Sequence, residues 1–467
     1  MAVPQVSDFG ELNFGRAQLG HEKRRSRLVS LANQIVAHPD GTLPDKLRDP
    51  AAYQAMYRLF KTKQVTHAAV LQTHRERTLE KMKAHEGTVL VLHDTTELDY
   101  TSKKSLHANL GQIGDGGGRG YECHNSLAVD GKTGELLGLA NQILHRRAKA
   151  GKKESVTKKR EREDRESLLW LHGSSAIGAP PSGSTWVDVC DRGADTFEFL
   201  DHEVRTERSF VVRSNHNRGI VVGHSPDGEH GLLHDHARTL PALGQRKVRV
   251  GGRDGKLTRW ANCMIAAGPV QILPPQKKRG KHRGLPLVLW VVRVWEVDPP
   301  EGEIEPVEWI LITNVSTVTL EHAVERVEWY EKRWIIEDFH KGQKTGCRIE
   351  DLQFRHTDRL EPMIALLSVV ALMMVNLRYA ARQPELAAAP AILHMPESYV
   401  AVLSVWRYGE RRTNLTISEF YLALARLGGH QNRKSDGPPG WLTLWRGWNS
   451  LQQMHDYAIK AGDERSD

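Results

Sequence analysis

The sequence contains only four cysteines among 467 residues, and no two of them form a C-x-x-C pair. This argues against a cysteine-based zinc site and suits a reducing compartment. Residues 1–15 include acidic residues and lack the apolar segment of a secretory signal, so no such signal is expected. The most apolar run, Ile364 to Leu377, follows Pro362 and ends before Arg378. It is shorter than the roughly 20 residues that span a bilayer, which favours a buried helix over a membrane segment.

The chain also shows no internal repeat, and its length predicts two or three domains rather than one core. With 39% hydrophobic and 26% charged residues it resembles an ordinary soluble globular protein. The net charge of +8 and the isoelectric point of about 9.2 favour polyanionic partners, although many basic proteins bind no nucleic acid. Basic residues concentrate at 146–165 and 277–283, and each run is either a nucleic-acid surface or a solvated face.

The first 75 residues are predicted to be mainly helical. Residues 22–36 combine a basic cluster with apolar residues at helical spacing, and residues 50–60 form a second helical stretch. A strand-rich pattern begins at Thr88. The predicted order is three strands, a helix, a strand, a helix and a strand, at residues 88–94, 126–129, 135–139, 154–172, 186–191, 196–204 and 209–213. This order is the opening topology of a ribonuclease-H-like α/β fold.

The second half of the chain contains a further strand-rich segment. Residues 215–307, which are rich in Gly and Pro, are predicted to form a β-rich insertion. A strand at 307–315 and one long helix at 320–344 follow, and the tail from Tyr399 is again helical. The turn sequence at 130–134, Asp-Gly-Lys-Thr-Gly, predicts a hairpin between the second and third strands.

Two of the predicted strands end on an aspartate, Asp94 and Asp191. An acid in this position can be catalytic, or it can simply cap the following turn. The predicted helix at 320–344 adds a third acid, Glu337, in an informative setting. At about 100° per residue, Glu337 shares a stripe about 60° wide with Tyr330, Arg333 and Lys344.

The opposite side of that helix is apolar and is predicted to be buried; it carries Trp329, Ile335, Ile336 and Phe339. The polar stripe has a plain alternative explanation, a surface ion-pair ladder of the kind that contributes little to stability. A phenol, a guanidinium, a carboxylate and an ammonium group on one stripe nevertheless suit a site where a metal and a phosphate backbone meet.

Tyr330-x2-Arg333-x3-Glu337-x6-Lys344 resembles the YREK signature of the insertion-sequence-four group of bacterial transposases. Residues 93–96, His-Asp-Thr-Thr, and 190–195, Cys-Asp-Arg-Gly-Ala-Asp, are similar to the two aspartate segments of that group. Further similarity is found at residues 210–214, 425–429 and 440–448. The resemblance covers nearly the whole chain and is closest to the hairpin-forming transposases of composite transposons. The chain departs from the pattern in the β insertion and in the basic run at 146–165.

The resemblance implies a DDE transposase with a ribonuclease-H-like catalytic core. Asp94, Asp191 and Glu337 are then the catalytic and metal-binding residues, holding two Mg²⁺ ions for which Mn²⁺ substitutes. The implied domains are a helical DNA-binding domain at 1–75, a catalytic domain at 76–380 that contains the insertion, and a helical dimerisation domain at 381–467. The implied reaction is cut-and-paste transposition: nicking of the transposon end, hairpin formation and opening, and strand transfer.

The implied partners are the terminal inverted repeats of the transposon, the target DNA and a second copy of the chain in the synaptic complex. Neither a membrane nor an organic cofactor is expected, and the expected location is the bacterial cytoplasm at the nucleoid. The residues placed against DNA are Tyr330, Arg333, Lys341, Lys344, Trp309, Arg213, Arg24, Arg25, Arg27, Tyr57 and Arg58. Among them, Trp309 stands where the group has a tryptophan that stacks on a flipped base.

Two other functions remain open: a nuclease of the same fold that cuts without joining, and an inactive DNA-binding relative that acts as an inhibitor. Three local signals point elsewhere but carry less weight. The glycine-rich residues 114–120 imitate a nucleotide loop, but no apolar strand precedes them and no helix follows. His224, His230, His234 and His236 suggest zinc without further ligands. Tyr330 as a recombinase nucleophile does not fit a metal-site stripe.

Overall fold

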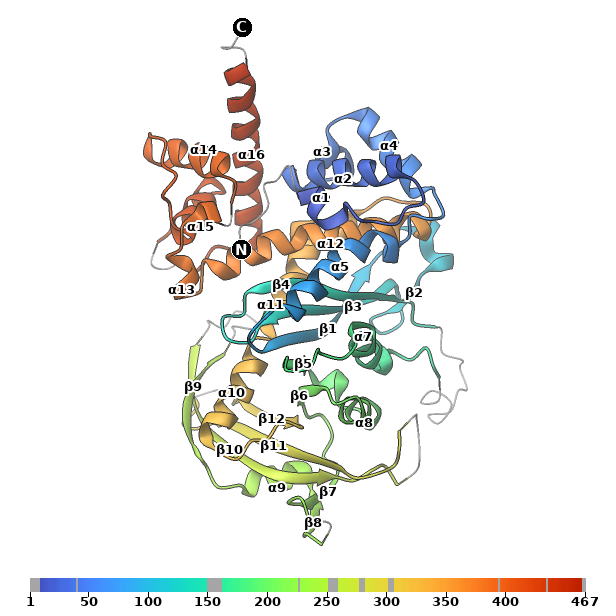
Figure 1. The fold of residues 1–467 in the computed structure, drawn as a ribbon, viewed down its shortest axis with the longest axis vertical. Helices are drawn as coiled ribbons and strands as arrows, with labels where there is room; N and C mark the ends of the chain where they lie inside the picture. The colour runs from blue at the N-terminus through green and yellow to red at the C-terminus, as the bar shows by residue number, and fades with distance from the viewer. Residues whose placement is uncertain are drawn as a thin grey trace.

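A twelve-stranded mixed sheet passes through the protein, with helices on both faces (Figure 1). The computed structural model describes residues 9–38, 41–148, 162–225, 227–250, 259–276, 282–300, 306–393, 395–433 and 436–463. The strand order is β2-β3-β1-β5-β6-β12-β11-β10-β7-β8, with β4 beside β3 and β9 beside β10. The protein is therefore a mixed α/β protein.

The central strands follow the predicted order. They are β1 (Val89–Asp99), β3 (Gly118–Asp130), β4 (Leu136–His145), β5 (Trp186–Cys190) and β6 (Ser209–Arg213). β1 pairs antiparallel with β3 and parallel with β5, and β5 pairs parallel with β6. The predicted hairpin at 130–134 is confirmed, since β3 and β4 pair across it. A short strand, β2 (Gly111–Ile113), pairs with β3 across the glycine-rich turn, which is therefore a hairpin turn and not a nucleotide loop.

The first strand is longer than predicted. β1 runs to Asp99, so Asp94 lies within the strand and not at its end. The reason is that β3 pairs with β1 along its whole length, from Asp130 to Gly120. The backbone hydrogen bonds of this pairing continue the strand beyond its apolar residues. The parallel pairing with β5 does stop at His93, and Asp191 does follow its strand directly.

The charged helix predicted at 154–172 is confirmed only over its last residues, 169–172, and is wrong for residues 162–168. A short 3-10 turn (Glu166–Leu168) is followed by the apolar helix α7 (Leu169–Ile177). Residues 149–161 and 277–281, which hold most of both basic runs, lie outside the described residues. The helix expected at 196–204 is present as α8 (Phe197–Arg205).

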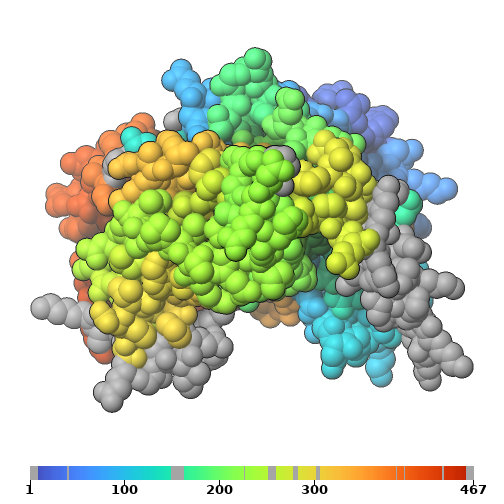
Figure 2. Space-filling view, turned by 90° about the horizontal axis from the view of Figure 1, so that it is seen from below, coloured from blue at the N-terminus to red at the C-terminus, as the bar shows by residue number. Residues whose placement is uncertain are grey.

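Residues between β6 and β12 (Glu308–Thr313) are rich in strands, as predicted. They form β7 (Gly219–Val222), β8 (His230–Leu232), α9 (Leu233–Thr239), β9 (Gly244–Val250), β10 (Arg259–Ile272) and β11 (Leu287–Glu296). These strands extend the central sheet through β12. The green and yellow surface in Figure 2 shows that this segment forms much of the lower face of the molecule.

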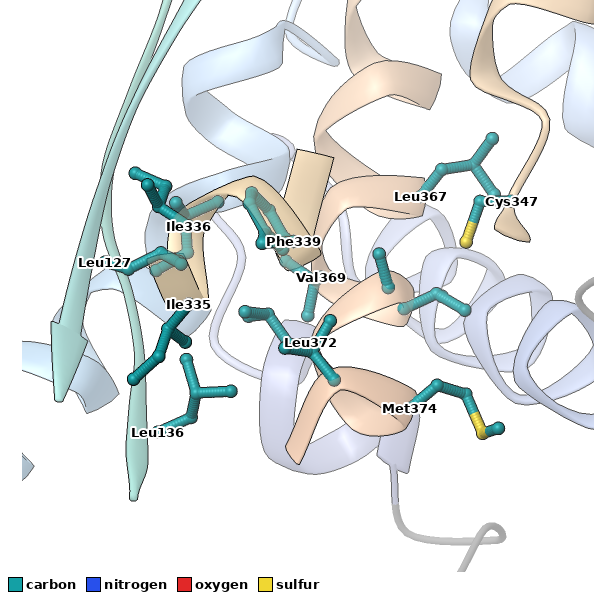
Figure 3. Close-up of a cluster of buried hydrophobic side chains, with 14 of the residues drawn as sticks. Leu127, Leu136, Ile335, Ile336, Phe339, Cys347, Leu367, Val369, Leu372 and Met374 are labelled. Atoms are coloured by element: carbon teal, nitrogen blue, oxygen red, sulfur yellow. The ribbon is translucent and has the colours of Figure 1, made fainter. Parts of the chain in front are cut away.

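The single long helix predicted at 320–344 is wrong. The chain forms α10 (Leu320–Glu331), breaks at Lys332 and Arg333, and continues as α11 (Trp334–Lys341) and a π-helical turn (Gly342–Gly346). The residues expected to be buried on its apolar side are buried. Figure 3 shows Ile335, Ile336 and Phe339 between helix α12 and the strands that carry Leu127 and Leu136. The break lets α10 and α11 follow different parts of the sheet.

The apolar run at 364–377 lies in a longer helix than predicted, α12 (Thr357–Ala380), which has Pro362 inside it. Within the described residues α12 is the one helix long and apolar enough to cross a membrane, but 83% of its most apolar window is buried inside the protein. It packs against α5 (His67–Lys83), β4 and α11. These contacts are those of a central core helix.

Helices precede and follow the sheet. The N-terminal ones are α1 (Phe9–Phe14), α2 (Glu22–Ala37), α3 (Leu43–Leu47) and α4 (Pro50–Phe60); the C-terminal ones are α13 (Pro384–Ala387), α14 (Glu397–Tyr408), α15 (Ile417–Leu427) and α16 (Trp441–Asp463). The two ends of the chain meet, because Trp448 Nε1 donates to the carbonyl oxygen of Val36 at 3.2 Å. One hydrophobic cluster includes residues of both groups and of α12. The domain limits at 75 and 380 stay predictions.

The glycines of α15 and α16 are required by close packing. A Cβ atom on Gly447 would lie 2.0 Å from the carbonyl oxygen of Leu424, and one on Gly428 would lie 1.8 Å from that of Thr443. Both obstacles are backbone atoms, which cannot rotate away as a side chain can. The glycine-rich sequence around Trp441 and Trp448 therefore sets how closely the two helices approach.

We predict that Gly447→Ala destabilises the protein by about 1–3 kcal/mol, because the added methyl group forces α15 and α16 apart. Urea unfolding followed by tryptophan fluorescence measures this difference. Gly231→Ala is the control, since no atom lies within 4 Å of its added Cβ. Equal unfolding midpoints for the two variants would show that the helices tolerate a wider spacing.

Candidate active site

The three predicted acids come from three elements that meet at one edge of the parallel pairing. The register pairs His93 with Cys190, so the next residues, Asp94 and Asp191, occupy matching positions on neighbouring strands. Glu337 lies in α11, which packs across β1. The side chains of Asp94 and Glu337 are 15% and 28% exposed, so the acids stand at the bottom of a partly open site.

Arg333 connects two of these acids. Its Nη1 donates to Asp94 Oδ2 at 3.0 Å, and its Nη2 donates to Glu337 Oε1 at 2.6 Å. The guanidinium is 10% exposed and lies at the start of α11, where the break after α10 places it over the end of the β1–β5 pairing. The sequence correctly placed Arg333 beside Glu337 but did not show that the same guanidinium reaches Asp94.

Burial controls the protonation of the two aspartates. It raises the pKa of Asp94 to about 7, and the repulsion from Asp191 and Glu337 adds to the effect, while Arg333 opposes it. Burial also raises the pKa of Asp191 above its ordinary value, again against the attraction of Arg333. The Asp191 carboxylate accepts from Gly193 N at 3.0 Å, which favours its charged form. Arg333 is the largest influence that opposes the effect of burial on both aspartates.

The donor set matches a hard divalent cation in chemistry. Carboxylate oxygens are the ligands that Mg²⁺ and Mn²⁺ prefer, and Asp94, Asp191 and Glu337 supply three such groups. The described residues nevertheless hold no cluster of three acidic, His or Cys side chains at distances that would bind an ion. Between Asp94 and Glu337 lies the guanidinium of Arg333. The three side chains have the chemistry that binds such a metal. The guanidinium of Arg333 would have to move before Asp94 and Glu337 could share one ion.

The polar stripe predicted on one helix is divided in the structure. Tyr330 is only 4% exposed, and its ring packs edge-on against Trp309, 5.2 Å between centroids. Burial lowers the pKa of Arg213, whose guanidinium lies close to Tyr330 and donates to the carbonyl oxygen of Glu308. The expectation of one continuous helical stripe is wrong, because the helix breaks between Tyr330 and Glu337, and both Tyr330 and Arg333 are buried. Trp309, 9% exposed, is covered by Tyr330 in this arrangement.

Lys344 stands apart from this group. It lies in the π-helical turn, and its Nζ is 3.4 Å from Glu350 Oε1. Glu350 also accepts from the backbone N of Asp99, at the far end of β1. Lys341, at the end of α11, is exposed. Lys344 is therefore tied to the far end of β1 through Glu350.

A buried ion-pair network behind the acids was not predicted. On the other face of the sheet, His93 Nε2 lies 2.7 Å from Asp188 Oδ1, and His93 Nδ1 lies 3.0 Å from Ser126 Oγ. Arg208 donates to both oxygens of Asp188 at 2.8 Å. Asp188 stays charged in this setting, because Arg208 and His93 lower its pKa below its ordinary value despite complete burial. The network fastens β1, β3 and β5 just below the acids.

A second buried network holds the glutamate helix. Asn125, which pairs with Asp94 in the sheet register, donates to His340 Nε2 at 3.1 Å, three residues after Glu337. Gln142 donates to Asn125 Oδ1 at 2.7 Å. An available signal for both networks was the presence of polar residues inside otherwise apolar strands, such as Asp188 in Trp-Val-Asp-Val-Cys.

Tyr57 opens onto a basic pocket that the sequence did not reveal. A cavity of about 410 Å³ is lined by Tyr57, Ser102, Lys103, Lys104, Ser105, Gln353, Phe354, Arg355 and Arg359. Its wall contains four cationic side chains and no acid. The cavity lies between α4, the turn after β1 and the start of α12, so it joins the N-terminal helices to the core.

The other N-terminal candidates are on the surface of α2 and α4. Arg27 and Arg58 are exposed. Arg24 donates to the carbonyl oxygen of Leu19 at 3.0 Å and Arg25 pairs with Glu22 at 3.2 Å, so both also have structural contacts. The four histidines considered for zinc do not gather: His224 contacts the carbonyl oxygen of Leu289, and His234 contacts Ser214.

Comparison with known families identifies the N-terminal helices. Residues 7–65 match a family model described as transposase DNA-binding. The matched segment includes α1 to α4, with Arg24, Arg25, Arg27, Tyr57 and Arg58 inside it. The match makes DNA a partner of this region and indicates a transposase.

We predict that Asp94 makes the protein less stable as the pH rises. Because its pKa in the folded protein, about 7, exceeds that of an unfolded Asp, the folded state holds a proton that the unfolded state has released between about pH 4 and pH 7. This contribution is present below pH 4 and is lost through pH 7, at up to about 1.4 kcal/mol per pH unit. Urea unfolding in EDTA should show Asp94→Asn gaining stability over the wild type across this window. A constant difference at pH 4.5 and pH 8 contradicts the assignment.

Proposed function

We propose that the protein is a DDE transposase of the insertion-sequence-four type that moves DNA by a cut-and-paste reaction. The observation that carries the proposal is the meeting of Asp94, Asp191 and Glu337 at the end of the β1–β5 pairing. The match of residues 7–65 to a transposase DNA-binding family supplies the substrate class. Neither feature alone separates a transposase from other metal-dependent nucleases.

The sheet supports a ribonuclease-H-like core. The five central strands lie in the order β4-β3-β1-β5-β6. β4, β3 and β1 pair antiparallel in that order, and β5 and β6 continue the sheet parallel to β1. In this order the carboxyl end of β5 lies beside the middle of β1, at His93 and Asp94, where the chain leaves for α8. A helix from the other end of the domain, α11, then brings Glu337 across β1.

The proposed chemistry is phosphodiester hydrolysis followed by transesterification. Bound divalent cations would activate a water or a 3′-hydroxyl and stabilise charge on the leaving oxygen. Asp94, Asp191 and Glu337 would hold these ions. The first hydrolysis frees a 3′-OH at the transposon end. This hydroxyl attacks a phosphodiester of the opposite strand, forming the hairpin bond while the bond to the flanking DNA breaks and its 3′-OH leaves. A second hydrolysis opens the hairpin and restores the 3′-OH. The freed 3′-OH then joins target DNA.

The surrounding side chains have proposed tasks in handling DNA. Arg333, Lys341 and Lys344 would neutralise phosphates near the cut, and Arg213 would do so from β6. Trp309 would stack on a base flipped out by the hairpin, once Tyr330 no longer covers its ring. Arg27 and Arg58, with the basic pocket at Tyr57, would hold the duplex farther from the cut. Base-specific contacts are not assigned, since phosphate contacts are blind to sequence.

We predict that replacing Asp94, Asp191 or Glu337 with Ala abolishes nicking and joining, while binding to the transposon end remains. Removing a metal ligand takes away charge stabilisation that exists mainly in the transition state. The assay is a gel time course with Mg²⁺ and a duplex copied from the inverted repeat that flanks the gene. It separates nicked, hairpin, double-strand-break and strand-transfer products.

Asp338→Asn is the matched control for Glu337→Ala. Asp338 is the next residue of α11, but its carboxylate faces away and pairs with Arg378 at 2.7 Å. The control should nick and join at the wild-type rate within about twofold. Mg²⁺-dependent cleavage by Glu337→Ala would falsify the proposed active site, and cleavage without joining by the wild type would identify a nuclease instead.

We predict that the basic pocket contributes a phosphate contact. Arg359→Ala should weaken DNA binding and reduce the slope of log affinity against log salt by about 0.9, the value for one released counterion. The slope is measured by fluorescence anisotropy between low and moderate NaCl. Arg205→Ala is the control, because Arg205 is an exposed arginine of α8 outside the pocket. An unchanged slope for Arg359→Ala would exclude the pocket from the DNA path.

A further inference from the structure

We propose that Arg333 is an internal counter-cation that keeps divalent metal out of the active site until DNA draws the guanidinium away. The inference rests on the proposed function, because it concerns the same three acids. It adds a control step: metal and DNA are loaded together and not independently. The contact between one arginine and two of the acids carries the argument.

Arg333 lies between Asp94 and Glu337, the two acids that would share a metal ion. One guanidinium spans Asp94 and Glu337, with both hydrogen bonds at 3.0 Å or less. A bridging metal and a bridging guanidinium would use the same carboxylate oxygens. Because both are cations, they would also repel each other at that distance. Within the described part of the chain the acids do not form a metal-binding cluster, as expected when the arginine separates them.

The charge balance of the site explains why an arginine is held there. The side chains of Asp94 and Glu337 are only 15% and 28% exposed, and two carboxylates held so close to one group repel each other when charged. Arg333 is itself only 10% exposed, and it forms an ion pair with both acids. The guanidinium therefore offsets the repulsion between the two carboxylates that a divalent cation would need.

DNA offers Arg333 a different partner. A phosphate group accepts two parallel hydrogen bonds from a guanidinium, as a carboxylate pair does. Glu337 is the more exposed of the two acids, so the contact on that side faces the solvent from which DNA arrives. Rotation of the guanidinium toward a phosphate would free both carboxylates at once. By thermodynamic linkage, metal must then tighten DNA binding by the same factor by which DNA tightens metal binding.

The test measures metal binding by the protein without turnover. Mn²⁺ is titrated into the full-length protein, first alone and then with the inverted-repeat duplex, and free Mn²⁺ is followed by electron paramagnetic resonance. We expect Arg333→Gln to bind Mn²⁺ at least tenfold more tightly than the wild type without DNA. We expect the duplex to tighten Mn²⁺ binding by the wild type and to have little effect on the variant. Arg333→Gln should nonetheless cleave DNA more slowly, because it lacks the phosphate contact.

Arg192→Gln is the matched control. Arg192 is exposed and follows Asp191 directly, so its loss removes one positive charge near the acids without removing a bridge between them. Its Mn²⁺ affinity should stay within about threefold of the wild type. If it rises as much as that of Arg333→Gln, general charge and not the bridge controls metal entry, and the proposal fails. Arg333→Lys, which keeps the charge without the two-pronged geometry, should fall between Gln and Arg.

The outcome separates this inference from the proposed function. Asp94→Asn in the Arg333→Gln background should abolish the tight Mn²⁺ binding; if it does not, the acids are not the metal site and the proposed function fails. If Asp94→Asn weakens Mn²⁺ binding but Arg333→Gln and wild type bind alike without DNA, only the gating role is overturned. Circular dichroism checks folding, and should Arg333→Gln not fold, Arg333→Lys carries the same comparison.

Discussion

Three carboxylates placed side by side on a partly buried surface repel one another, and the structure balances them with one guanidinium. Arg333 contacts Asp94 and Glu337 directly and is the main attraction that limits the rise in the pKa of Asp191. This single contact requires α10 to end before Arg333, α11 to cross β1 and β1 to extend beyond its pairing with β5. The site is therefore one in which a single buried guanidinium offsets the repulsion between neighbouring carboxylates.

Buried polar groups beneath the site fix the relative positions of the three acids. Asp188 and Arg208 behind the sheet fix β5 against β1 through His93. Asn125 and His340 fix α11 against β3. Such groups are costly to bury unless every partner is present, so they permit few alternative arrangements of the strands. Backbone pairing sets the spacing of the acids, and these side chains keep that spacing from varying.

The N-terminal helices contact both the core and the C-terminal helices. The segment matched to a transposase DNA-binding family ends near α4, whose Tyr57 lines a basic cavity shared with the core. The same N-terminal helices contact α16, since Trp448 donates to the carbonyl oxygen of Val36. The N-terminal helices therefore contact the C-terminal helix at one place, and at the cavity they border the turn that follows β1.

Local periodicity and turn chemistry were enough to predict the strands near Asp94 and Asp191, the hairpin at 130–134, the strand-rich segment before Trp309 and the helical region around Glu337. Three other features depend on contacts between distant residues. They are the extension of β1 to Asp99, the break of the predicted long helix at Arg333 and the packing of Tyr330 on Trp309. The basic pocket at Tyr57 was equally hidden, because its cations come from segments separated by some 250 positions. Local sequence patterns show which residues form a strand or a helix. They do not show which distant residues come into contact, and those contacts set strand length, helix breaks and shared cavities.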